Sequence, residues 1–534
     1  MKRTQVARRQ GEPDTARVVG RGLFVITGAK VWFMLGGAAI TFGLPFIFDR
    51  YHASGRALYG QYYDLNNILS IFSMVMVTGV MQSVSRFVAP TPHAAKGIVQ
   101  QALRVISVAG ALLGGGLILL SPTIAITRGN PDLVHGYRAA GCIVFAYGIY
   151  TVMVGCLNGQ KRFVTQALLD ITFTTLKVAL VLGMAVVGLG VLGAFAGFAM
   201  AATIIAIVAI GFIYPKLNGG SASGGYTRYA LQVMMYAFVF NLIFKLDGVF
   251  VKPVVYSVLH SPELGSIISG LDHLWPSRWP MWVEDVLQHQ TDEKMANYGM
   301  ALALARLPWQ GTIAVTFVMF PLMSAASFAE NQTAATTYIR QTLRYSTVII
   351  GLAVALLVAL PESIFALLPA GYESGARIIL LLGPAYFFFS LFNLANTLLI
   401  ASGRAAVALA IGTLTVALVS LAYWVYLPSA SSAHAVLLRA AQVNLVMFAF
   451  GLALGLGALW RTYGPPFPLG TAARIGIAMS VVIIIGRISP SLAPIQGALA
   501  AIGLTGVFVL LLVATGEFDQ TDRARLFALF GRRK

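Results

Sequence analysis

The sequence predicts an all-α polytopic membrane protein. Hydrophobic residues make up 58% of the chain, and only 10% of the residues are charged. Apolar runs of about twenty residues, the length that crosses a bilayer as a helix, recur throughout. This composition excludes a soluble globular core. A transmembrane β-barrel is also excluded, because barrels need short strands of alternating polarity rather than long apolar runs.

The apolar runs predict about fourteen transmembrane helices, which places both ends of the chain on one side of the membrane. We expect them near residues 22–48, 61–85, 100–127, 138–157, 164–188, 190–213, 229–252, 298–323, 343–368, 376–401, 405–427, 436–459, 469–486 and 495–515.

An internal repeat predicts two related helical lobes. The run that begins at Tyr59-Gly60 has an echo about half the chain later, at Tyr298-Gly299, with polar first turns and a Phe-, Val- and Met-rich centre in both copies. Repeats in membrane carriers place the transport site between the two copies, so we expect a central cavity. The predicted parts are an N-lobe with spans one to six (1–216), an inter-lobe linker (217–228), a C-lobe with spans seven to twelve (229–460), and two further helices with a basic tail (461–534).

The formal net charge of +18 is explained best by membrane topology. Basic residues cluster before the first span and after the last, which predicts that both termini are cytoplasmic. Nucleic-acid binding by these tails is the alternative that we reject, so no nucleic-acid partner is expected; the expected partners are membrane lipids and a substrate. Four basic residues fall in loops expected on the opposite side: Arg50, Arg56, Arg128 and Arg138.

The sequence predicts no enzyme chemistry. The two cysteines, Cys142 and Cys156, fall in one predicted helix, too far apart for a disulfide. The Gly-rich runs lack the lysine and serine of a phosphate-binding loop and indicate close helix packing instead. We find no Ser/His/Asp set and no metal-ligand spacing, and therefore expect no catalytic residues, no metal and no cofactor.

Two segments lie outside the regular pattern. The linker LNGGSASGGYT, from Leu217, is either a hinge or an ordinary disordered loop. The hydrophilic insertion 254–294 is expected on the extracytoplasmic face, and its tryptophans indicate a segment at the membrane surface or, alternatively, a platform for a sugar or a partner. These tryptophans are Trp275, Trp279 and Trp282.

Charged residues inside apolar runs are the candidate binding residues. Each charge at the bilayer centre costs about 2.5–3.5 kcal/mol, which is best explained by a shared water-filled cavity. Internal ion pairs or snorkelling to the interface are the alternatives. The candidates are Lys30, Lys177, Lys245, Asp247 and Arg306.

Two polar residues at the start of the second span complete the candidate set. Asp64 and Asn67 are expected either at the cavity rim or as caps of that helix. Basic residues outnumber acids inside the spans, so the cavity should attract anions, and phosphate or diphosphate is the ligand that Lys and Arg suit best.

A family resemblance rests on short motifs in the first lobe. Lys30 lies in span one, Arg50 at its far end, and Tyr59-Gly60 follow; SVSRF closes span two, and LNGQKRF follows span four. This pattern resembles the oligosaccharide flippases of the multidrug/oligosaccharidyl-lipid/polysaccharide exporter (MOP) superfamily. Span one lacks the arginine cluster of the lipid II branch, so the polysaccharide or O-antigen type is favoured.

The resemblance implies a non-enzymatic flippase of the bacterial inner membrane. It implies transfer of undecaprenyl-diphosphate-linked oligosaccharide from the cytoplasmic to the periplasmic leaflet by alternating access, for lipopolysaccharide or other surface polysaccharide, with a polysaccharide polymerase or ligase as a further partner. A drug or cation exporter of the same superfamily and a membrane glycosyltransferase or ligase remain alternatives. Asp247 is expected either to exchange pairing with a lysine or to carry a coupling ion.

Overall fold

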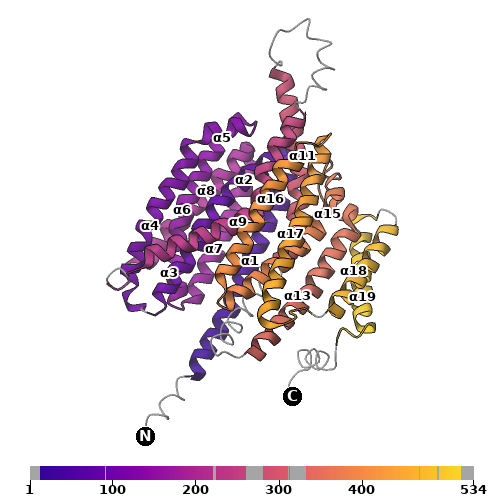
Figure 1. Ribbon diagram of the computed structural model, residues 1–534. Helices are drawn as coiled ribbons and strands as arrows, with labels where there is room; N and C mark the ends of the chain where they lie inside the picture. Colours follow the sequence, from indigo (N-terminus) through magenta and orange to yellow (C-terminus); the bar gives the residue numbers. More distant parts are fainter. Residues whose placement is uncertain are drawn as a thin grey trace. The chain divides into compact units, whose positions relative to one another are not determined.

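The computed structural model describes most of the chain, and its regular structure in the described residues is helical (Figure 1). The described residues are 12–90, 92–220, 224–259, 281–310, 312, 332–467, 469–489 and 492–518. Twelve helical segments are long and apolar enough to cross a membrane. The polytopic helical prediction is therefore confirmed, whereas the count of fourteen is not.

The difference in count has two sources. One of the twelve segments, Phe163–Lys216, contains two of the predicted spans. They are joined by a π-helical turn at Ala185–Leu189, where Gly188 has φ 90° and Gly190 has φ 54°, values that a residue with a side chain rarely adopts. The predicted span 298–323 is not among the twelve, and much of it lies outside the described residues.

The chain folds into two compact units, Met1–Ala296 and Asn297–Lys534. In the described residues, the helices of unit 1 are α1 (Glu12–Tyr51), α2 (Gly55–Met74), α3 (Val80–Val88), α4 (Ala95–Leu119), α5 (Ser121–Thr127), α6 (Val134–Gly159), α7 (Phe163–Met184), α8 (Gly190–Ile213) and α9 (Tyr226–Leu259). A π-helical turn, Val75–Gly79, joins α2 to α3. Helix α11 (Met281–Ala305) begins in unit 1 and ends in unit 2.

Helix α6 is the centre of unit 1. It packs against α4 on one side and α8 on the other, and these three helices lie side by side (Figure 1). In the most apolar stretch of this helix, 78% of the residues are buried inside the protein. Small residues allow this packing: a methyl group on Gly114 of α4 would lie only 2.6 Å from the carbonyl oxygen of Gly141 in α6.

Helix α9 belongs to the same compact unit as the first eight helices. It packs against α2 and α3, although the prediction assigns it to the second lobe. It begins at Tyr226, and of the predicted linker the described residues 217–220 and 224–225 are not helical. Helix α9 continues to Leu259 and α11 begins at Met281, so residues 254–259 and 281–294 of the predicted insertion are helical. Trp275 and Trp279 lie outside the described residues.

Unit 2 contains the other helices for which the structure gives bounds: α13 (Gln332–Ala359), α14 (Pro361–Phe365), α15 (Gly375–Ala401), α16 (Ala405–Tyr426), α17 (Ala433–Tyr463), α18 (Leu469–Ile488) and α19 (Pro494–Ala514). Its most extensive packing is between α15 and α17. The last two helices are held against α13 by apolar contacts and by Glu517, which accepts hydrogen bonds from Arg344 (2.6 Å) and Arg474 (3.2 Å). The ion pairs anchor a buried carboxylate at the end of this three-helix group.

Candidate functional site

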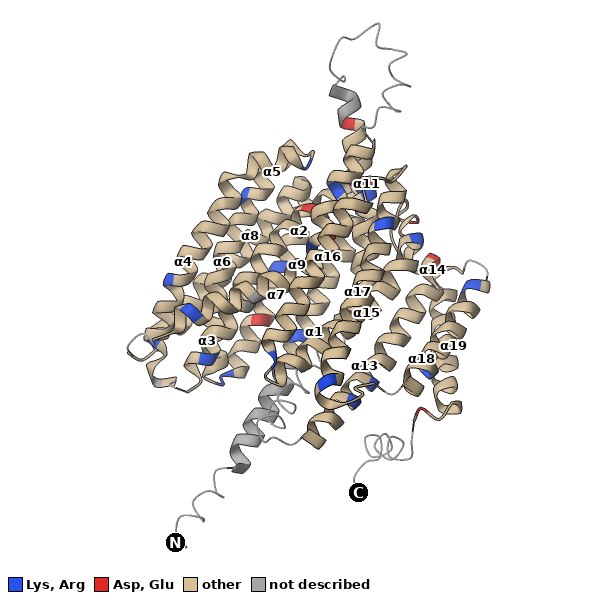
Figure 2. Ribbon diagram, viewed as in Figure 1, with Lys and Arg blue, Asp and Glu red and all other residues tan. Residues whose placement is uncertain are grey.

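Charged residues are sparse along the helices (Figure 2), and several of those inside unit 1 meet in pairs or clusters. The first pair joins α1 to α7. The Lys30 ammonium lies 3.3 Å from the Asp170 carboxylate, which also accepts a hydrogen bond of 2.8 Å from the Tyr150 hydroxyl of α6. The Lys30 side chain is 37% exposed, compared with 11% for Asp170. Lys30 therefore has the internal ion pair that the sequence left as an alternative.

Lys177 is held by aromatic rings rather than by a carboxylate. Its Nζ lies 4.9 Å from the ring centre of Phe33, 5.1 Å from that of Phe198 and 5.8 Å from that of Phe173. These rings come from α1, α8 and α7. No carboxylate in the described part of the chain pairs with Lys177. A cation over ring faces gains about 0.5–2 kcal/mol per contact, so this charge is stabilised without being neutralised.

The same lysine lines a small cavity in unit 1. The cavity has a volume of about 140 Å³ and lies between α1, α2, α7 and α8. Its polar lining includes Thr41, Tyr62, Asn66 and Lys177. The cavity is mixed in polarity, with one cation among aromatic and amide groups. This arrangement can hold an anionic group that also offers polar surface.

Lys30 and Lys177 are near each other. The Lys30 ammonium lies 6.0 Å from the same Phe33 ring that contacts Lys177. Two of the predicted candidates thus flank one aromatic side chain of α1. Asp170 is seven residues, about two turns, before Lys177 in α7, so both point to a similar face of that helix. Together they form the lysine site: Lys30, Lys177, Asp170 and Phe33.

A second cluster is almost completely buried. Asp64 of α2 accepts a hydrogen bond of 2.9 Å from Arg128 Nε and lies 3.4 Å from the Lys252 ammonium of α9. Lys252 also pairs with Asp292 of α11 at 2.9 Å. Each of the four side chains is at most 7% exposed. We call these four residues the buried charge network.

Neutral groups complete this network. Asn130 donates a hydrogen bond of 3.1 Å to one oxygen of Asp292, and Gln61 donates one of 3.0 Å to the other. Arg128 also donates to the carbonyl oxygen of Gly248 at 2.6 Å. Burial alone lowers the pKa of an arginine, but the Asp64 carboxylate raises the pKa of Arg128 above its usual value, so the guanidinium stays charged.

The remaining candidates occupy separate positions. The Asn67 amide donates a hydrogen bond of 3.0 Å to the backbone carbonyl of Lys245, which joins α2 to α9. Asp247 is 3% exposed and accepts a hydrogen bond from the backbone N–H of Gly248. Helix α2 begins at Gly55, so Asp64 and Asn67 lie in its third and fourth turns and the capping alternative is wrong. Arg306 belongs to unit 2, where its Nε donates a hydrogen bond of 2.9 Å to the hydroxyl of Tyr386.

Four charged residues of these clusters are absent from the predicted set: Asp170, Arg128, Lys252 and Asp292. A signal for Asp170 was present, because a carboxylate within an apolar span requires a partner. In the sequence, Arg128 and Arg56 stand out only as exceptions to the charge rule for loops. Their partners are Asp64 and Glu293, 64 and 237 positions away in the sequence, and no local pattern indicates such pairs.

Comparison with known proteins supports a transport fold. Residues 55–269 match the family described as "Polysaccharide biosynthesis protein". No curated protein matches the chain by sequence. Several solved structures share the fold at low identity. The structure of "Lipid II flippase MurJ, inward closed conformation" aligns with a TM-score of 0.64 and 11% identity, over 90% of this chain and 98% of that one.

Two other structures are superfamily transporters. An inward-facing multidrug resistance MATE family transporter of the MOP superfamily aligns with a TM-score of 0.59 and 13% identity, over 82% of this chain and 99% of that one. A MOP superfamily transporter from Pyrococcus furiosus, whose title reports a binding pocket of reverse polarity, aligns with a TM-score of 0.51 and 14% identity, over 83% and 94%. The chain therefore has the fold of MOP superfamily transporters.

Proposed function

We propose that this chain is a flippase that moves undecaprenyl-diphosphate-linked oligosaccharide from the cytoplasmic to the periplasmic leaflet of a bacterial inner membrane. The match to a polysaccharide biosynthesis family and the MOP transporter fold support this class of function. The observation that carries the choice of substrate is the lysine site, in which Lys177 lines a cavity and Lys30 lies beside it. Two cations suit a diphosphate.

In this proposal the two lysines act differently. Lys177 has no carboxylate partner among the described residues and provides a positive charge that no neighbouring acid neutralises. Lys30 is paired with Asp170 and is released when a diphosphate competes for it. Exchange of one anionic partner for another keeps the ammonium paired throughout, which avoids the cost of an isolated charge in the membrane. Phe33 and Phe198 offer flat faces to the sugar next to the diphosphate.

The buried charge network supplies a closed barrier for alternating access. It joins α2 and the segment after α5 to α9 and α11, and all four of its residues belong to unit 1. A cluster of two acids and two bases at most 7% exposed leaves little room for a hydrated headgroup. To open this barrier, the ion pairs of the network must separate and become solvated. The network therefore holds the closed state until substrate binding or a coupling ion offsets that cost.

The direct test is lipid transfer by the purified full-length chain in vesicles. A fluorescent undecaprenyl-diphosphate oligosaccharide is placed in both leaflets, and a membrane-impermeant quencher reports how fast the inner pool reaches the outside. We expect flipping with the wild-type chain and at least about tenfold slower flipping for Lys177→Gln. Transfer no faster than in empty vesicles overturns the proposed function.

A cation exporter is the alternative that shares this fold, because MATE transporters align with the chain. Such a protein requires acidic groups for its substrate. Two intramembrane carboxylates of unit 1, Asp64 and Asp170, are instead paired with cations. Resistance to organic cations conferred by the expressed chain, together with no effect on surface glycan, would favour the exporter. Neither function requires a polysaccharide polymerase or ligase. We propose such proteins only as downstream partners.

A further inference from the structure

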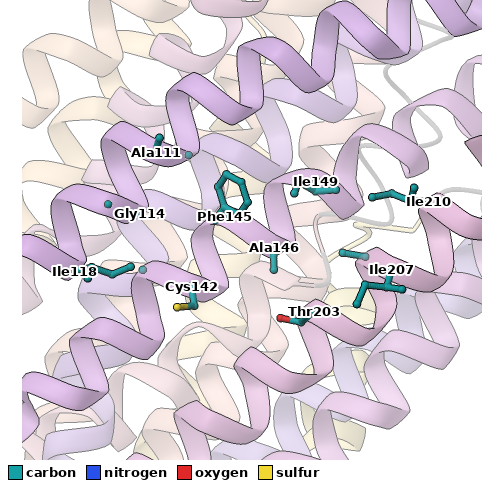
Figure 3. Close-up of a pocket in the computed structure, with 14 residues that line it drawn as sticks. Ala111, Gly114, Ile118, Cys142, Phe145, Ala146, Ile149, Thr203, Ile207 and Ile210 are labelled. Atoms are coloured by element: carbon teal, nitrogen blue, oxygen red, sulfur yellow. The ribbon is translucent and has the colours of Figure 1, made fainter.

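An apolar groove on the outer side of unit 1 is separate from both charged clusters. It lies between α4, α6 and α8 and has a volume of about 440 Å³. Figure 3 shows the side chains that line it, among them Phe145, Ile149 and Ile207. Gly115 of α4 leaves the groove open, because a methyl group there would meet nothing within 4 Å.

The helix faces around the groove are those that contact lipid. Leu112 of α4 is 71% exposed, and Ile207 of α8 is 65% exposed. Exposed aliphatic side chains on a membrane helix lie against hydrocarbon. A groove between two such faces cannot hold water favourably, so a hydrocarbon chain is the occupant that its surroundings provide.

One end of the groove leads to a basic stripe. On α4, Arg104 lies seven residues before Ala111, which lines the groove, so the two residues share a face of the helix. Gln100, on the same face, donates a hydrogen bond of 2.9 Å to Tyr214, just after α8, and Lys96 lies 5.8 Å from that ring. Lys216 is also at this end. In the described part of the chain none of these three cations pairs with a carboxylate.

The size of the groove limits the chain that fits. The volume of 440 Å³ lies in the range of roughly 300–1,000 Å³ that is usual for pockets holding one small ligand. This is room for about one fatty acyl chain. A polyprenyl chain is several times longer.

We propose that this groove binds one acyl chain of an anionic glycerophospholipid, whose phosphate is held by Arg104, Lys96 and Lys216. The basic end is the one expected in the cytoplasm, where anionic lipids attract such clusters. The inference does not depend on the transported substrate. It assigns to the N-terminal unit a lipid site distinct from the lysine site.

Native mass spectrometry of the purified full-length chain tests this proposal with two lipids of identical acyl chains, phosphatidylglycerol and phosphatidylethanolamine. We expect one tightly retained phosphatidylglycerol in the wild type, at least about tenfold lower occupancy in Gly115→Leu, and weaker retention in Arg104→Gln. Gly116→Leu is the matched control, because Gly116 is the next residue of α4, does not line the groove and also has no atom within 4 Å of an added methyl group. Equal retention of the two lipids, or undiminished retention in Gly115→Leu, overturns the proposal.

A second readout locates the lipid. Cys142 is exposed in the groove, whereas the chain's other cysteine, Cys156, is buried. In bilayer nanodiscs, phosphatidylglycerol should slow alkylation of Cys142 by a membrane-soluble maleimide relative to phosphatidylethanolamine, and Arg104→Gln should reduce the difference. Equal rates in both lipids contradict the proposal. Displacement of phosphatidylglycerol by undecaprenyl phosphate would also overturn it and would assign the groove to a polyprenyl chain.

Discussion

Lys30 of α1 and Asp170 of α7 form an ion pair of 3.3 Å. A charge swap separates a structural role of this pair from substrate binding. In the double variant Lys30→Asp, Asp170→Lys the opposite charges remain, so we expect thermal unfolding close to that of the wild type. We expect flipping of the lipid-linked glycan to fall at least about tenfold, because the cation has left α1. Recovery of wild-type flipping by the swap would show that Lys30 only joins the helices.

Lys177 should be required for its charge. We expect Lys177→Gln to reduce flipping at least about tenfold, and Lys177→Arg to keep part of the activity because arginine also stacks on aromatic faces. The vesicle assay measures both variants at equal protein content. Lys161→Gln, at an exposed lysine between α6 and α7, is the control that also removes one positive charge. Equal losses in Lys161→Gln and Lys177→Gln would argue for an effect of overall charge.

Removal of the Asp64 carboxylate should destabilise the folded protein. It contacts both Arg128 and Lys252 in the buried charge network, and its loss leaves two buried cations with too few partners. We expect Asp64→Ala to lower the free energy of unfolding by about 3–5 kcal/mol. Arg487→Ala breaks a more exposed pair with Glu362 and should cost no more than about 1 kcal/mol. Denaturant unfolding in detergent measures both, and equal costs would refute the importance of burial.

Gly60 should not accept a side chain. A methyl group at this position would overlap the backbone carbonyl of Asp292, where α2 meets α11. We expect Gly60→Ala to destabilise the protein by about 1–3 kcal/mol despite the better helix propensity of alanine. Gly43→Ala is the control, because an added methyl group there meets only Leu182 at ordinary contact distance, 3.6 Å or more. Unchanged unfolding of Gly60→Ala would contradict the close approach of the two helices.

The sequence predicted the helices of this protein better than its ionic contacts. An apolar run of twenty residues in a membrane has to form a helix, because its backbone groups have no water to bond to. For that reason α15, α16 and α19 lie close to their predicted positions. In span 298–323 the residues Arg306, Pro308 and Gln310 interrupt the apolar run, and this span is not among the twelve segments.

Ion pairs depend on which helices meet, and a single sequence does not contain that information. Arg128 does not fit the charge rule for loops, and its ion pair with Asp64 explains its position. Lys30 and Lys177 were found because each lies in an apolar run, and their common neighbour Phe33 was not predicted. The Tyr59-Gly60 motif indicates a repeat in the sequence, and the contact of Gly60 with α11 explains why that position carries no side chain.

The aromatic surroundings of Lys177 have an electrostatic consequence for unit 1. Lys30 with Asp170 carries a total charge of zero, as do the four residues of the buried charge network. Ring faces attract a cation through their quadrupole and contribute no net charge of their own. The electric potential that reaches an approaching anion from these groups is therefore that of a monopole centred on one ammonium, while the other groups act as dipoles whose influence fades more steeply with distance.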